Sequence, residues 1–102
     1  MMYQLVLQLP ASSIKDYDAM IELEDAISAH LGEAGVVDGH DAGAGEMNIF
    51  IHTNEPERVF ENVRTLLETR SLMSRVRVAF REFGSDTFVI LHPRDAEDFS
   101  IA

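Results

Sequence analysis

Hydrophobic and polar residues alternate along three stretches of this chain, a period-two pattern typical of strands that are covered on one face. The stretches are residues 3–9, 46–52 and 76–83. In each stretch one set of alternate positions is almost wholly apolar, as in Leu5 and Leu7, whereas the other set mixes apolar and polar side chains. We therefore predict three strands of one sheet, each with an apolar face and a mixed face.

Apolar residues recur at helical spacing in two further segments. Asp16 is the expected N-cap of a helix that continues to Leu31, and Gly32 provides its stop. Thr53 or Asn54 is expected to cap a second helix, which has Pro56 in its first turn and ends at about Arg70. The predicted apolar stripes are Tyr17, Met20, Ile21, Ile27 and Leu31 in the first helix, and Val59, Phe60, Val63, Leu66 and Leu67 in the second.

Glycine and proline residues mark the remaining turns. Residues 35–40 are predicted to form a short edge strand, which a glycine-containing turn at 42–45 joins to the strand at 46–52. A second turn at 84–86 leads to a last strand at 87–92, which pairs either in its own sheet or with a neighbouring copy. Residues 93–102 form an acidic tail that we expect to be loosely ordered, although its Phe99 and Ile101 are able to dock on a core.

The element order is thus β-α-β-β-α-β with an additional C-terminal strand, in a single α+β domain of residues 1–102. With right-handed crossovers, this order predicts a ferredoxin-like sandwich in which two helices cover one face of an antiparallel sheet. The strand at 3–9 is then expected between those at 46–52 and 76–83. The mixed face of the sheet is expected to stay bare.

The mixed face has the composition of an interaction surface more than that of a solvent-facing sheet. Val6, Phe50 and Ala79 are expected to form an apolar centre there, with Phe83 on the same face. Polar side chains surround this centre. The candidate ligand- or partner-binding residues are Gln4, Gln8, Asn48, Phe50, His52, Arg77 and Arg81.

Charge and composition narrow the classes of function. The chain has 102 residues, a formal net charge of −10 and no cysteine. The negative charge argues against nucleic acid and anionic lipid as partners, because both attract Lys and Arg. Without cysteine there is no disulfide, thiol nucleophile or thiolate metal site. No apolar run approaches the ~18 residues of a membrane span and the N-terminus lacks a secretory pattern, so we expect a cytoplasmic protein.

Several patterns suggest chemistry without matching a dedicated motif. Asp38, His40, Asp41 and Glu46 flank the glycine turn, but their spacing fits neither an EF-hand loop nor a zinc site. The glycines join two strands, whereas a phosphate-binding loop joins a strand to a helix. Among the four histidines, His52 on the mixed face is the candidate for proton transfer or ligand binding. The sequence therefore assigns no catalytic residue, metal or cofactor.

Arg77 and Arg81 belong to a basic segment of this acidic chain, since four arginines and one glutamate lie within residues 70–82. Each guanidinium group can pair with a carboxylate of a ligand, of a partner or of the protein's own Glu46. We favour ion pairs within the molecule or its dimer. RNA recognition on this face is disfavoured, because the basic and aromatic pattern of RNA-binding sheets is absent and the net charge is negative.

Residues 39–56, which read GHDAGAGEMNIFIHTNEP, resemble a family of small bacterial proteins. The second hairpin of that family reads approximately Gly-His-Asp, a glycine pair, Glu, Asn-Ile-Phe-Ile and a Thr-x-x-Pro helix start. The resemblance implies a shared fold and lends no catalytic residue, because the family has no assigned activity. In topology alone the chain is also similar to ACT-type ligand-binding regulators and dimeric α+β barrel proteins.

Three hypotheses of function follow from these features. The first is a non-enzymatic regulatory or binding module that self-associates, as a dimer, through the mixed sheet face. The second is an acidic inhibitor or immunity-type protein that covers a basic site on another protein, with salt-dependent association. The third, with the weakest support, is a small enzyme that uses His52 as a base and Arg77 or Arg81 to bind an anionic substrate.

Overall fold

The computed structural model describes residues 2–11 and 17–101 of the chain. In these residues the structure has one five-stranded antiparallel sheet and two helices, which confirms the α+β part of the predicted fold class. The elements in chain order are β1 (Tyr3–Pro10), α1 (Tyr17–Leu31), β2 (Val36–Gly43), β3 (Glu46–Thr53), α2 (Pro56–Thr69), β4 (Arg77–Glu82) and β5 (Val89–His92).

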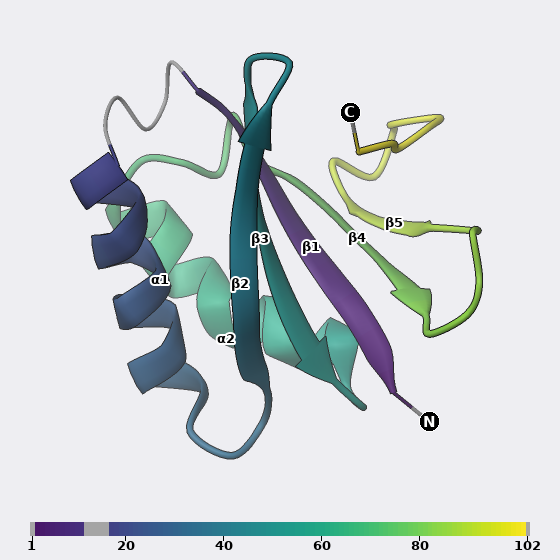
Figure 1. Ribbon diagram of the computed structural model, residues 1–102, viewed down its shortest axis with the longest axis horizontal. Helices are drawn as coiled ribbons and strands as arrows, with labels where there is room; N and C mark the ends of the chain where they lie inside the picture. Colours follow the sequence, from purple (N-terminus) through teal and green to yellow (C-terminus); the bar gives the residue numbers. More distant parts are fainter. Residues whose placement is uncertain (1, 12–16, 102) are drawn as a thin grey trace.

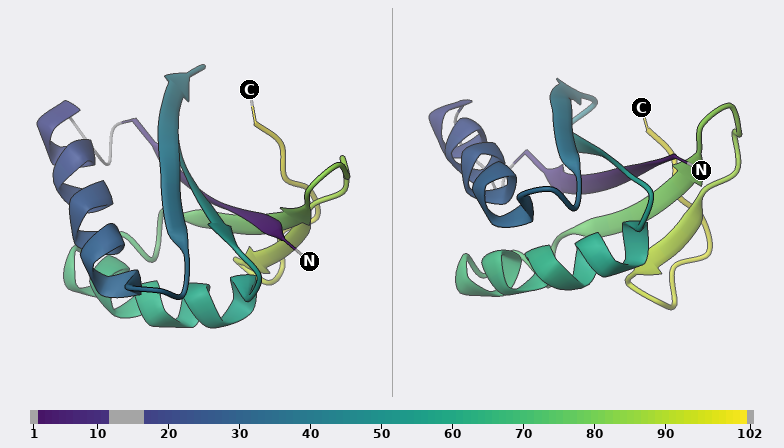
Figure 2. Two further views of the ribbon diagram at one scale, coloured as in Figure 1. Left: turned by 60° about the horizontal axis from the view of Figure 1, so that its bottom comes forward. Right: turned by 90° about the horizontal axis from the view of Figure 1, so that it is seen from below.

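The strand order in the sheet is β2-β3-β1-β4-β5, with β1 at the centre as predicted. Figures 1 and 2 show a strongly twisted sheet that carries α1 and α2 on one side. The C-terminal segment, drawn in yellow, turns back after β5 toward the side of the sheet opposite to α2 (Figure 2). The sheet therefore lies between a complete helical layer and a short segment of irregular chain.

The hydrophobic core fills the space between the helices and the apolar faces of the strands. Leu5, Leu7 and Leu9 of β1 are fully buried at its centre. Removing each such side chain from water stabilises the fold by about 1.5–3 kcal/mol. The other buried members of the core from regular elements are Met20, Leu23, Ile27, Leu31, Ile49, Ile51, Val59, Phe60, Val63, Leu67 and Val78.

The first helix differs from its prediction on one flank. The proposed N-cap Asp16 lies outside the described residues, and α1 is described from Tyr17. Tyr17 was expected in the apolar stripe but is exposed, and its ring contacts the imidazole of His40 at a centroid distance of 5.7 Å. Leu23, which the predicted stripe omitted, is buried instead. The buried face is therefore rotated away from Tyr17.

The hairpin of β2 and β3 is longer than predicted. Its turn consists of Ala44 and Gly45, both at positive φ (51° and 79°), as a two-residue hairpin turn requires. A bulge between Val37 and Gly39 shifts the register of β2 against β3. Because a bulge inserts one extra residue, the alternation of faces along β2 changes at Asp38.

The second helix begins two residues later than a Thr53 cap would place it and one residue later than an Asn54 cap would. Its N-cap is Glu55, whose side chain makes no capping hydrogen bond, and Pro56 occupies the first turn as expected. Thr53 has a different role from the predicted one. Its buried hydroxyl accepts a hydrogen bond from the Glu55 backbone N–H (3.0 Å) and donates one to the carbonyl of Ala34 (2.8 Å), which ties β3 to the loop before β2.

The last strand is shorter than the predicted range and pairs with β4 of its own chain. Its His92 imidazole Nε2 makes a hydrogen bond with the carbonyl of Met73 at 2.8 Å. This contact and the β4 pairing hold β5 at the edge of the sheet. The residues after β5 are then free to leave the sheet plane and cross it.

Candidate functional site

The mixed face of the sheet is organised as three rows that run across the strands. The register pairs Asp41 with Asn48, Asn48 with Gln8, and Gln8 with Arg77 in the first row. Side chains in directly opposed positions lie about 4.5–5.5 Å apart and interact. The second row is Gly39, Phe50, Val6, Ala79 and Ile90, and the third is Val36, His52, Gln4 and Arg81. The predicted apolar centre is thus flanked by two polar rows.

The first row is a buried chain of hydrogen bonds. The Asn48 amide donates to the carboxylate of Asp41 (2.9 Å) and accepts from the Gln8 amide (3.1 Å). Gln8 also donates to the backbone carbonyl of Ser100 in the C-terminal segment (2.9 Å). Gln8 and Asn48, both candidate binding residues, are only 1% and 2% exposed, so their donor groups serve the structure itself.

The apolar row is unevenly covered. Val6 and Ala79 are fully buried, although no helix covers them, whereas Phe50 on β3 is only half-buried. The C-terminal segment accounts for the difference, because its described contacts with the sheet are made to Gln8 of β1 and Arg77 of β4. The expectation of a bare mixed face is therefore wrong for the half that β1 and β4 form.

The C-terminal segment is fixed by arginine and aromatic contacts. Arg77 donates a hydrogen bond to the carbonyl of Asp98 (2.9 Å), and its guanidinium group lies 6.0 Å from the centre of the Phe99 ring. The Phe99 ring packs against Phe88 at 5.0 Å, and Arg81 lies 5.4 Å over Phe88. The two arginines thus make cation–π contacts with two aromatic residues that follow β4, Arg77 with Phe99 and Arg81 with Phe88.

Neither arginine pairs with Glu46, the internal partner that the sequence suggested. Arg77 has the Asp98 carboxylate at 3.7 Å, so an internal ion pair exists but with a residue of the tail. Arg81 donates through Nε to the Gln4 side chain (3.0 Å) and, more weakly, through a terminal nitrogen to the Ser85 carbonyl (3.4 Å). Both guanidinium groups are therefore occupied within the molecule.

His52 lies in the exposed half of the mixed face, next to an acid and an aromatic ring. Its Nε2 is 3.3 Å from a carboxylate oxygen of Asp38, the residue in the β2 bulge. The ring of Phe83 contacts the imidazole edge-to-face at 4.8 Å. A carboxylate beside an imidazole orients the ring, which equips this pair to exchange hydrogen bonds with a partner.

We define the β2–β3 patch as Val36, Asp38, Phe50, His52 and Phe83. Val36 and Phe83 are among the most exposed large apolar residues described, at 67% and 48%. No contact of the C-terminal segment with these five residues is described, since its contacts with the sheet are to Gln8 and Arg77. The patch combines apolar surface with one acid and one base, as the rims and centres of protein interfaces do.

The four polar residues around the glycine turn separate in space, because the bulge sends them to different neighbours. Asp38 faces His52 and Asp41 binds Asn48, whereas His40 pairs with Glu24 of α1 on the helix side. Among the described residues, no three His, Asp or Glu side chains are grouped as metal ligands. The hairpin thus uses Asp38, His40 and Asp41 in three separate pairs.

Sequence reasoning missed two parts of this site. The ordered crossing of the tail has a sequence signal, since aromatic and aliphatic residues at Phe99 and Ile101 interrupt an acidic stretch. The contact of Asp38 with His52 has no sequence signal, because it depends on the bulge.

His52 and Arg81 lie in the same row but are separated by Gln4. Their strands are therefore about 10 Å apart, which is two strand spacings.

Comparison of the chain with protein-family models, with curated proteins and with solved structures gives no match. The resemblance of residues 39–56 to a small bacterial family therefore stays a prediction. Among the described helices, neither has the length and apolar character needed to cross a membrane.

Proposed function

We propose that this protein is a non-enzymatic binding module that self-associates through the β2–β3 patch. The observation that carries the proposal is the uneven cover of the mixed face. The tail and two arginines shield β1 and β4, whereas Val36 and Phe83 stay exposed beside His52. The chain's own residues cover one half of the apolar row. The other half is exposed apolar surface of the kind that a binding partner covers.

A second copy is favoured as that partner because the patch is self-complementary. In a two-fold symmetric pair the same surface meets itself, so an acid in one copy must find a base in the other. Asp38 and His52 supply one of each, 3.3 Å apart within a single chain. Val36 and Phe83 supply the apolar area between them.

We also infer a ferredoxin-like plan for the fold. The element order β-α-β-β-α-β and the sheet order β2-β3-β1-β4 support it, with β5 added at one edge. This plan leaves one sheet face without helices. It therefore supports a face-mediated binding role and lends no activity.

Sedimentation velocity across a concentration series tests self-association. We expect a monomer–dimer equilibrium in which Val36→Asp raises the dissociation constant at least about tenfold, since a charge would be buried at the contact. Val89→Asp is the matched control, because Val89 is an exposed valine (50%) on the opposite edge strand. A chain that stays monomeric at every concentration, or responds equally to both variants, contradicts the proposal.

A second candidate function is that of an acidic inhibitor or immunity-type protein that binds a basic partner. The formal net charge of −10 favours it, as do the exposed acids Asp18, Glu22 and Asp25 on α1. Salt separates the two candidates. Self-association of two acidic chains should strengthen as salt screens their repulsion, whereas binding to a basic partner should weaken.

An enzyme with His52 as base has the weakest support. The two described cavities are lined by other residues than His52, and Arg81 is held by Gln4 and Phe88. The Asp38–His52 pair is the observation in its favour. A turnover assay in which His52→Gln changes nothing would remove this candidate.

A further inference from the structure

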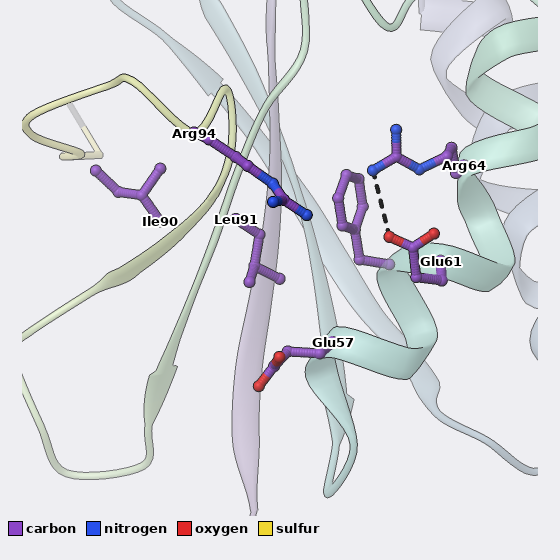
Figure 3. A pocket seen from close by; sticks show the side chains of 7 residues that line it. Glu57, Glu61, Arg64, Ile90, Leu91 and Arg94 are labelled. Carbon is purple, nitrogen blue, oxygen red and sulfur yellow. Dashed lines mark hydrogen bonds and ion pairs between the residues drawn. The ribbon is translucent and has the colours of Figure 1, made fainter.

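A groove of about 370 Å³ lies between α2 and the residues of β5 and the turn after it, outside the β2–β3 patch (Figure 3). This volume is within the range of small-molecule sites, which is about 300–1,000 Å³. One wall comes from Glu57, Phe60, Glu61 and Arg64 of α2. Leu91 and Arg94 contribute to the other wall.

The helical wall follows from sequence spacing. Its four residues recur at positions i, i+3, i+4 and i+7, which share one face of an α-helix. This face is directed to the sheet edge where β5 lies. Phe60 is only 3% exposed and belongs to both the core and the groove, so its ring provides a fixed apolar floor.

Two guanidinium groups converge on the groove. Arg64 lies over the Phe60 ring at 4.9 Å and donates to the Glu61 carboxylate at 3.3 Å. Its Nε–H is buried and has no hydrogen-bond partner among the described residues. Figure 3 shows the Arg94 side chain extending into the groove from the β5 side and the Arg64 side chain entering it from the α2 side. Within the described part of the chain, Arg94 makes no hydrogen bond or ion pair.

This convergence is unusual for a chain with a formal net charge of −10. Eighteen acidic residues are available, yet no described carboxylate pairs with Arg94, which lines the groove together with Arg64. Two guanidinium groups on one groove favour an anion there. Glu57 and Glu61 also border the groove. Their carboxylates repel a multiply charged anion, so the site is suited to a single negative charge.

We propose that the groove binds a small organic monocarboxylate with an apolar body. The carboxylate pairs with the Arg94 guanidinium and the outer edge of Arg64. The apolar body lies against Phe60 and Leu91. Glu57 and Glu61 discriminate against phosphate esters and other dianions. The proposal is independent of self-association, because no residue of the β2–β3 patch lines the groove.

Three probes that share a phenyl group and differ in charge test the site by titration into ¹⁵N-labelled protein, followed by NMR. They are 3-phenylpropionate, its neutral amide and phenyl phosphate. We expect 3-phenylpropionate to shift the amide signals of α2 and β5 with a dissociation constant of about 1 mM or tighter. The amide and phenyl phosphate should bind at least about tenfold more weakly, because the first lacks the charge and the second is a dianion.

Arg94→Gln should weaken binding of 3-phenylpropionate about tenfold, as expected for loss of one charge-assisted pair. Arg75→Gln removes the same charge from an exposed position outside the groove and should change nothing. Val36→Asp should also leave binding unchanged, which separates this site from the patch. No binding, equal binding of the amide, tighter binding of phenyl phosphate, or equal effects of the two arginine variants would each overturn the proposal.

Discussion

The two faces of the sheet are built in different ways from the same strands. On the helix side, Leu7 and Val78 are opposed in register and fully buried in a continuous apolar core. On the other side, Val6 and Ala79 are opposed and equally buried, but what covers them is a segment without regular structure. Equal burial is therefore achieved by two helices on one face and by an arginine-anchored tail on the other.

The comparison indicates that two equally buried faces need not be equally rigid. A packed helix is held by many side chains along its length, whereas the described contacts of the tail with the sheet involve only a few residues, such as Gln8 and Arg77. Regions with few buried apolar contacts open at lower free energy than the core. The two faces should thus differ in stability although both hide apolar residues from water.

The largest expected effect comes from a matched pair of valine substitutions. Val78→Ala should lower the free energy of unfolding by about 2–3 kcal/mol, because the rigid core cannot fill the cavity. Val6→Ala removes the same atoms from a fully buried site and should lower it by only about 1–2 kcal/mol, because the tail can settle into the space. Urea unfolding measures both, and equal losses would contradict the contrast between the faces.

Removal of residues 94–102 should have the next largest effect, a loss of about 2 kcal/mol, since Phe99 and the hydrogen bonds to Ser100 and Asp98 disappear. In the shortened chain Val6 is no longer covered, so Val6→Ala should then have little further effect. Val78→Ala should keep its full effect. Additive losses for the deletion and Val6→Ala would show that the tail does not cover this face.

Substitutions in the first row, the hydrogen-bonded row of Asp41, Asn48 and Gln8, should lower the free energy of unfolding by less. Asn48→Ala removes the acceptor for Gln8 and the donor to Asp41, and we expect a loss of about 1–2 kcal/mol, as for a buried hydrogen bond whose partner remains. Asn62→Ala, an exposed asparagine on α2, is the control and should change stability by less than about 0.5 kcal/mol. Hydrogen exchange of β3 amides should rise in the first variant alone.

The smallest effect concerns an ion pair on the helical layer. Arg70 of the α2 C-terminus binds both carboxylate oxygens of Glu22 on α1 (2.6 and 3.4 Å), and these hydrogen bonds lower the pKa of Glu22 below its ordinary value. Because the folded pKa is the lower one, the pair stabilises the fold above the ordinary Glu pKa of about 4.3. That contribution is lost as the pH falls through the lowered value.

Glu22→Gln should therefore make the free energy of unfolding fall less steeply on acidification below about pH 5. Asp25→Asn, an exposed acid on the same helix, is the comparison. Since both members of the Glu22–Arg70 pair are near the surface, the effect at neutral pH should be small and should shrink further in high salt. Identical pH profiles for the wild type and Glu22→Gln would contradict a stabilising pair.

Periodicity was sufficient to predict much of the fold. The alternation in β1 and β3 identified Leu5, Leu7 and Ile51 as core residues, and all are buried. The pattern also placed Val6 opposite Phe50 and Ala79, as the register does. It failed for α1 at Tyr17, because a single tyrosine at helical spacing fits either flank of the stripe and only packing against β2 decides between them.

The candidate site was less predictable than the fold, for a physical reason. Gln8 and Asn48 look like surface polar residues in half-covered strands. The tail, about ninety positions away in sequence, returns to bind Gln8, and Asn48 is held by Gln8 and Asp41. Similarly, a bulge of one residue brings Asp38 to His52 and sends His40 to Glu24. Neither the return of the tail nor the bulge produces a periodic pattern of apolar residues in the sequence.

The chain by itself thus determined the helices, the strands and the division of each strand into an apolar and a mixed side, because these depend on neighbours within a few residues. Tertiary structure alone decided which half of the mixed side is hidden, which arginines are occupied and which line a groove. Those outcomes depend on the path of the chain after β5 and on the register of one edge strand. Both are set by contacts between residues far apart in sequence.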